Sequence, residues 1–136
     1  MSVTQAAQRQ INTANKLSLS GGTMTGAFIE SVVTLTDAAT IVVDATLGNI
    51  FKVTLGGNRT LGNPTGVVDG QKMVFRIRQD ATGSRTLAYD TKFRFGTVLT
   101  LAAATLSTTA AKTDYIGVIY HATDDKFDVV AFMKGY

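Results

Sequence analysis

Apolar and polar side chains alternate in two segments of this 136-residue sequence, Ile50-Phe51-Lys52-Val53-Thr54-Leu55 and Met73-Val74-Phe75-Arg76-Ile77-Arg78-Gln79. In the first segment Phe51 shares one face of an extended chain with Val53 and Leu55, because successive side chains of a strand point to opposite sides. In the second segment Arg76 and Arg78 point away from the apolar side chains between them. This alternation predicts two strands that each have one face in a core and the other in water.

The same type of pattern continues from Phe28 to the end of the chain, with turn residues between short apolar runs. A final hairpin is expected, with its loop at residues 122–126, whereas residues 101–106 fit either a strand or a helical turn. Many short strands at this spacing favour a jelly-roll-like antiparallel β-sandwich. Strands are predicted near residues 28–35, 40–45, 49–55, 59–61, 72–79, 85–89, 92–95, 97–101, 114–121 and 127–133.

The composition also indicates an all-β protein. Nine of the ten acidic residues are Asp, which favours turns over helix interiors, and only Glu30 is Glu. The chain has no cysteine, which excludes disulfides, thiolate zinc sites and cysteine nucleophiles. It has no apolar run of about 18 residues, so a membrane-spanning helix and a membrane partner are not expected.

The N-terminal segment differs from the rest. Residues 1–29 contain Arg9 and Lys16 but no acid, and within residues 1–19 apolar side chains recur at a spacing near 3.6. We expect an extended or helical anchoring arm with a glycine-rich hinge over residues 1–27, followed by a β-sandwich domain over residues 28–136; a frayed terminus is the alternative. The residues expected to dock on a partner are Val3, Ala7, Arg9, Ile11 and Lys16, and the hinge residues are Gly21, Gly22 and Gly26.

Few residues suggest catalysis. His121 is the single histidine, and no G-x-S-x-G nucleophile motif is present. The densest acidic cluster, formed by Asp124, Asp125 and Asp128, lacks the glycine and distal Glu of an EF-hand loop, so a solvated hairpin tip is the favoured interpretation. We therefore expect no enzyme activity, no metal site and no cofactor.

Six cations could form a weakly basic face, although edge protection or solubility is the interpretation favoured for them. Five aromatic residues could line a sugar-binding surface, or they could fill the core. A nucleic-acid partner is not expected, since a dense basic face with stacking aromatics is missing. The cations are Lys72, Arg76, Arg78, Arg85, Lys92 and Arg94, and the aromatics are Tyr89, Phe93, Phe95, Tyr115 and Tyr120.

The stretch Leu17-Ser18-Leu19-Ser20-Gly21-Gly22-Thr23-Met24-Thr25-Gly26-Ala27 resembles a motif common in bacteriophage fibre proteins, L-x-L-S-G-G-T-M-T-G-x-[IF]. In those proteins the motif leads from an attachment or shaft segment into the next domain. Three further segments, at residues 51–61, 70–80 and 127–136, are similar to small β-domains of phage structural proteins.

This resemblance implies a homotrimer on the virion that is fixed by its N-terminal segment to the major capsid protein or another virion component. Because the chain is short and Met1 reads as a true start, we expect a capsid decoration protein or short head fibre with a projecting β-domain. The alternative is a tail-fibre or receptor-binding tip that recognises host surface glycans. A polysaccharide-degrading enzyme would need paired acids in a groove, whereas the carboxylates of this sequence fall in turns.

Overall fold

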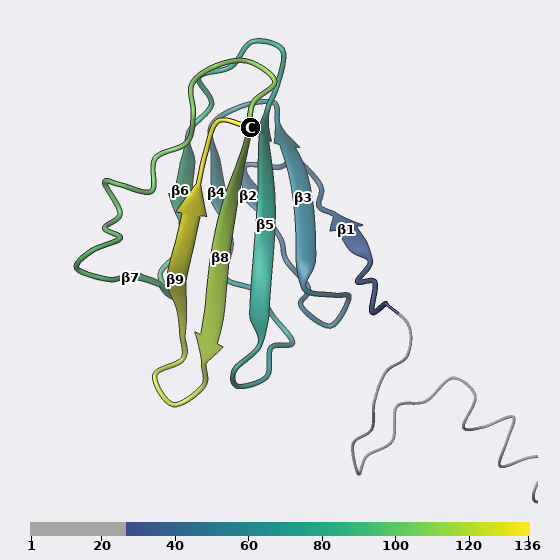
Figure 1. Cartoon of the computed structure of the whole chain (residues 1–136), viewed down its shortest axis with the longest axis vertical. Coiled ribbons are helices and arrows are strands. Elements are labelled where there is room, and N and C mark those ends of the chain that lie inside the picture. The colour runs from purple at the N-terminus through teal and green to yellow at the C-terminus, as the bar shows by residue number, and fades with distance from the viewer. Residues whose placement is uncertain (1–26) are drawn as a thin grey trace, which may run out of the picture.

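The computed structural model describes residues 27–136, which form two β-sheets (Figure 1). The larger sheet has the strand order β1-β3-β5-β8-β9-β7, and the smaller sheet has the order β2-β4-β6 and lies behind it in Figure 1. The strands are β1 (Val32–Thr34), β2 (Thr40–Ile41), β3 (Ile50–Leu55), β4 (Arg59–Leu61), β5 (Lys72–Gln79), β6 (Leu87–Tyr89), β7 (Phe93–Phe95), β8 (Thr113–His121) and β9 (Lys126–Met133).

The first six strands alternate between the two sheets, so that the chain makes three stacked coils. β1, β3 and β5 lie parallel in the larger sheet, and β2, β4 and β6 lie parallel in the smaller one. The register between β3 and β5 places Phe51 opposite Phe75 and Lys52 opposite Arg76. At these two positions, successive coils therefore carry the same type of side chain.

The last strands complete the larger sheet in a different way. β8 is antiparallel to both β5 and β9, and β7 lies parallel to β9 at the edge. The β8–β9 pairing contains a register shift between Gly117 and Val118. The predicted final hairpin is confirmed, including the placement of Asp128 on its second strand.

The all-β class is confirmed, and the two sheets are consistent with a β-sandwich. The expected antiparallel pairing holds for β5–β8 and β8–β9 only, and the other five pairings of the described strands are parallel. Period-two alternation fixes which side chains face inward, but it does not fix the neighbour or direction of a strand. Residues 97–101 form no strand, and Ala104 N–H donates to the carbonyls of Thr100 and Leu101 in a single tight turn.

The core lies between the two sheets. Phe51 and Phe75 are fully buried and stacked, with ring centroids 5.4 Å apart. Ile41 and Leu61 reach the same core from the smaller sheet and are also fully buried. Each such side chain contributes about 1.5–3 kcal/mol to folding by leaving water. No described residue belongs to a helix long and apolar enough to cross a membrane.

One charged side chain lies in this interior. Asp114 is fully buried at the start of β8, where its carboxylate accepts hydrogen bonds from Ser107 N–H at 2.7 Å, the Ser107 hydroxyl and Gly135 N–H at 2.9 Å. A buried carboxylate is tolerable when such donors surround it. Asp114 thereby holds the loop before β8 and the C-terminal residues at the same end of the sheet.

Candidate functional site

The outer face of the larger sheet carries the polar side chains of its central strands. The inward positions of β3 and β5 are apolar except for Gln79, and the outward positions include Lys52, Thr54, Arg76 and Arg78. The pairing registers align these side chains with others in two rows across the sheet. The first row is Thr34–Lys52–Arg76–Tyr115 and the second is Thr54–Arg78–Thr113.

An open groove of about 490 Å³ follows the two rows. Its walls carry three cations and four hydroxyl groups. Because four neighbouring strands supply these groups, backbone hydrogen bonds fix their relative positions. The lining residues are Thr34, Lys52, Val53, Thr54, Arg76, Arg78, Thr113 and Tyr115.

None of the three groove cations forms an ion pair in the part of the chain that the structure describes. Residues 1–26 contain no Asp or Glu that could supply one. Lys52 lies directly opposite Arg76, and like charges in that position destabilise a sheet. The groove therefore holds three cations that have no ion-pair partner among residues 27–136.

Arginines elsewhere in the described chain are paired. Arg59 contacts Asp37 through Nε at 2.7 Å, and Arg85 contacts Asp80 through Nη2 at 2.8 Å. Hydrogen bonds from these two guanidinium groups lower the pKa of Asp37 and of Asp80. Among the arginines of residues 27–136, the absence of such a partner distinguishes Arg76 and Arg78.

Tyr115 closes one end of the first row. Its ring meets the ring of Tyr136 edge to face, with centroids 5.5 Å apart and planes at 88°. The backbone of Tyr136 exchanges two hydrogen bonds with Thr113, at 2.9 and 3.1 Å. The C-terminal residue therefore supports the tyrosine that borders the groove.

A row of apolar residues runs beside the first polar row. It consists of small or β-branched residues, and Val74 is the most central with 37% of its surface exposed. The register makes this row continuous across five strands, so an apolar strip borders the cationic groove. The row is Val32–Ile50–Val74–Gly117–Ala131.

The six cations considered in the sequence do not form one face. Arg76 and Arg78 lie in the groove and Lys72 lies at the other end of β5, whereas Arg85 is paired with Asp80 in a turn. Edge protection does not apply to β5, because this strand lies between β3 and β8. Sequence reasoning missed Lys52, although its outward position in an alternating strand was a usable signal.

The acidic cluster of the β8–β9 hairpin is neutralised by cations from the β7 region. Arg94 contacts Asp128 through Nε at 2.6 Å and Asp124 through Nη1 at 2.7 Å, and Lys92 contacts Asp125 at 2.7 Å. Hydrogen bonding to Arg94 lowers the pKa of Asp128, and hydrogen bonding to Lys92 lowers that of Asp125.

Neither metal ligation nor a catalytic triad is indicated at this hairpin. Among residues 27–136, no group of three or more His, Cys, Asp or Glu side chains is arranged to hold a metal ion. The imidazole of His121 lies at the surface, where Nδ1 accepts a long hydrogen bond of 3.3 Å from Asp124 N–H. These aspartates therefore act as partners of the β7 cations, and they fasten the edge strand to the hairpin.

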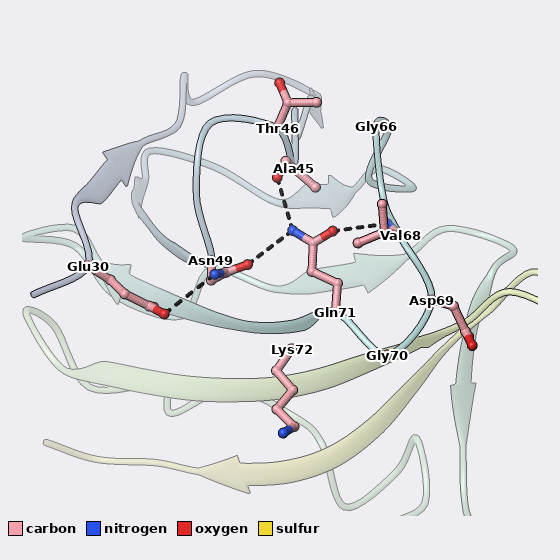
Figure 2. A pocket seen from close by; sticks show the side chains of 10 residues that line it. All are labelled: Glu30, Ala45, Thr46, Asn49, Gly66, Val68, Asp69, Gly70, Gln71 and Lys72. Atoms are coloured by element: carbon pink, nitrogen blue, oxygen red, sulfur yellow. Dashed lines mark hydrogen bonds between the residues drawn. The ribbon is translucent and has the colours of Figure 1, made fainter. Parts of the chain in front are cut away.

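A second hollow, of about 620 Å³, lies among the loops that precede β3 and β5 (Figure 2). Its central side chain is Gln71, whose Nε2 donates to the Ala45 carbonyl and to Asn49 Oδ1, both at 3.0 Å. Gln71 Oε1 accepts from Val68 N–H at 3.2 Å, and Asn49 in turn donates to Glu30. The amide groups that line this hollow are thus occupied in joining three loops.

Most of the aromatics considered for sugar binding belong to the core. Phe93 is buried, and Tyr89, Phe95 and Tyr120 pack against the core cluster. Tyr89 also donates its hydroxyl to the Ala104 carbonyl, and burial raises its pKa. Of the five, Tyr115 is the one that lines the groove.

The residues predicted to dock on the capsid and the hinge glycines lie in residues 1–26, outside the described part of the chain. These residues are Val3, Ala7, Arg9, Ile11, Lys16, Gly21, Gly22 and Gly26.

Comparison with known proteins gave one family. A family model described as "Putative phage tail fibre C-terminal domain" matches residues 30–125, which is more than half of the chain. The matched region contains all the residues that line the groove. No curated protein and no solved structure matches the chain.

Proposed function

Since the chain belongs to the family of the putative phage tail fibre C-terminal domain, we propose that it is the tip domain of a phage fibre and contacts the host cell surface. The family identifies a virion-associated fibre protein with a structural role. The host-contacting role is our inference, and the match over residues 30–125 is the observation that carries it.

The outer face of the larger sheet supports a role in recognition. A rigid sheet can present a preorganised set of side chains to a ligand with little entropic cost on binding. The groove cations and hydroxyls meet this condition, because they project from four hydrogen-bonded strands. The cations of the loops and of the β7 edge are already paired with aspartates, so they offer less to a ligand.

The protein is also proposed to act as a homotrimer. The stretch at residues 17–27 supports this through its resemblance to fibre motifs that precede trimeric domains. Closed threefold symmetry would present three copies of each binding face and raise the avidity for a repetitive surface. Mass photometry should give a particle of three chains, and a monomer at micromolar concentration would contradict the trimer.

A capsid decoration protein or short head fibre is the second candidate. It is favoured by the cationic, acid-free N-terminal segment, in which Arg9 and Lys16 could meet an acidic capsid surface. In that case the arm would attach to the major capsid protein, and the β-domain would project from the head.

Two measurements test the tip assignment. Antibodies against residues 27–136 should label the distal end of the tail fibre in electron micrographs of intact particles. Host cells incubated with excess full-length protein should adsorb fewer particles, because the protein occupies the same surface sites. Labelling spread over the capsid shell, with undiminished adsorption, would overturn the tip assignment in favour of the decoration protein.

A further inference from the structure

We propose that the groove over β1, β3, β5 and β8 binds an anionic polysaccharide of the cell surface, with Lys52, Arg76 and Arg78 holding its carboxylate or phosphate groups. This inference rests on the proposed host-contacting function and specifies the chemistry of the ligand.

The sign of the ligand's charge follows from the missing counter-charges. Arg59, Arg85 and Arg94 each have an aspartate partner, whereas Arg76 and Arg78 have none among residues 27–136. Placing Lys52 beside Arg76 without an acid weakens the folded state. An anion bound between them would remove that repulsion and form charge-assisted hydrogen bonds with both side chains.

The other lining groups favour a saccharide. Thr34, Thr54 and Thr113 place hydroxyl groups among the cations, and such groups can both donate to and accept from sugar hydroxyls. Tyr115 adds an aromatic ring at the end of the first row, against which the apolar face of a sugar can pack. The apolar strip that includes Val74 extends this surface.

The two alternative polyanions fit less well. An acidic peptide that binds by strand addition would pair with the edge strand β1, whereas all three groove cations lie on the interior strands β3 and β5. A single-stranded nucleic acid needs a series of aromatic platforms, and the groove offers Tyr115 alone.

The spacing of the groove cations suits a polysaccharide with regularly repeated charges. Neighbouring strands are about 4.8 Å apart, and alternate residues of a strand are about 6.7 Å apart. Lys52 and Arg76 are neighbours across strands, and Arg76 and Arg78 are alternate residues of β5. A polymer with one charge per sugar could therefore occupy several cations at once, and several weak contacts would add up.

The test uses the full chain and polygalacturonate, a saccharide with one carboxylate per sugar, at pH 7 and low salt in a calorimetric titration. We expect binding that weakens as sodium chloride is added. The double variant Arg76→Gln/Arg78→Gln should bind at least about tenfold more weakly, because two charge-assisted contacts are lost. The matched variant Lys126→Gln/Lys134→Gln removes the same charge outside the groove and should bind within about twofold of the original protein.

Circular dichroism and thermal melting of both variants would exclude a loss of fold. Dextran, poly-L-glutamate and oligo-dT serve as the uncharged, peptide and nucleic-acid comparisons. The inference is overturned if polygalacturonate does not bind, if the two double variants bind it equally, or if any comparison polymer binds as tightly.

The outcome can be separated from that of the proposed function. If Arg76→Gln/Arg78→Gln still blocks particle adsorption as well as the original protein, the groove assignment fails while the tip assignment stands. If the groove binds polygalacturonate but the protein never blocks adsorption, the tip assignment fails instead.

Discussion

The two faces of β3 and β5 contrast sharply although they are made by alternate residues of the same strands. On the inner face, Phe51 stacks on Phe75 with both rings fully buried. One residue further along each strand, Lys52 lies opposite Arg76 on the outer face with no acid paired to either. The same parallel register thus places a favourable aromatic pair on one side and an unfavourable pair of like charges on the other.

This contrast separates the residues that stabilise the fold from those available for binding. The inner pair stabilises the folded state, because both rings leave water and stack on each other. The outer pair has no acidic partner among residues 27–136, so a favourable ionic contact would have to come from another molecule. Mutations on the two faces should therefore change different measured quantities.

The largest effect is expected on the inner face. Phe75→Ala should lower the free energy of unfolding by about 3–5 kcal/mol, because it opens a cavity in the core and removes the stacking partner of Phe51. Urea unfolding followed by circular dichroism would measure this loss. Arg76→Ala, one residue away, is the control and should leave the urea midpoint nearly unchanged. Comparable losses in both variants would refute the separation of the faces.

Much of this fold could be predicted from local pattern. The strands at residues 50–55 and 72–79 and their inward faces were correctly predicted from alternation, as was the final hairpin. The parallel coils could not be predicted, because contacts between distant turns determine them. Asp37 pairs with Arg59 and accepts from Gly56 N–H, and Asn58 accepts from Thr86 N–H. No local signal in the sequence links these residues.

The candidate site was predicted less completely. Arg76 and Arg78 stood out as outward-facing cations on one strand. Their combination with Lys52 and Tyr115 depends on which strands flank β5 and in which register, and that information is not local. The ion pairs that remove Arg85 and Arg94 from the basic face likewise became visible only in the folded chain.

A second, smaller effect should appear on acidification, and it concerns the cations that do have aspartate partners. The paired aspartates Asp37, Asp80, Asp125 and Asp128 have a lowered pKa in the folded protein, chiefly through hydrogen bonds to Arg59, Arg85, Lys92 and Arg94. The unfolded chain therefore takes up protons at higher pH than the folded chain does. The stabilisation is complete above the unfolded pKa of 3.8 and is lost as the pH falls below it.

The melting temperature should accordingly stay nearly constant from about pH 7 to about pH 5 and decrease below about pH 4. Differential scanning calorimetry across this range measures the change. Asp128→Asn should melt lower than the original protein at pH 7, but the difference should shrink as the pH falls below 3.8, because the unfolded original protein is then stabilised by taking up a proton at Asp128. A difference that stays constant with pH would mean that the ion pair with Arg94 does not stabilise the fold.

The smallest expected change in stability follows from mutations on the outer face. Unlike the changes above, it should leave the protein equally stable or more stable. Arg76→Gln/Arg78→Gln removes the charges that repel Lys52, so the free energy of unfolding should stay the same or rise by about 0.5 kcal/mol. Added salt screens this repulsion, so the change in stability with salt should be more favourable for the original protein than for the double variant, which keeps the same ion pairs elsewhere. Urea unfolding at about 0.01 M and about 0.15 M sodium chloride compares the two. If the double variant is less stable than the original protein at both salt concentrations, the two arginines stabilise the sheet. Their charge would then be explained by folding, and the proposal that the groove binds an anion would be contradicted.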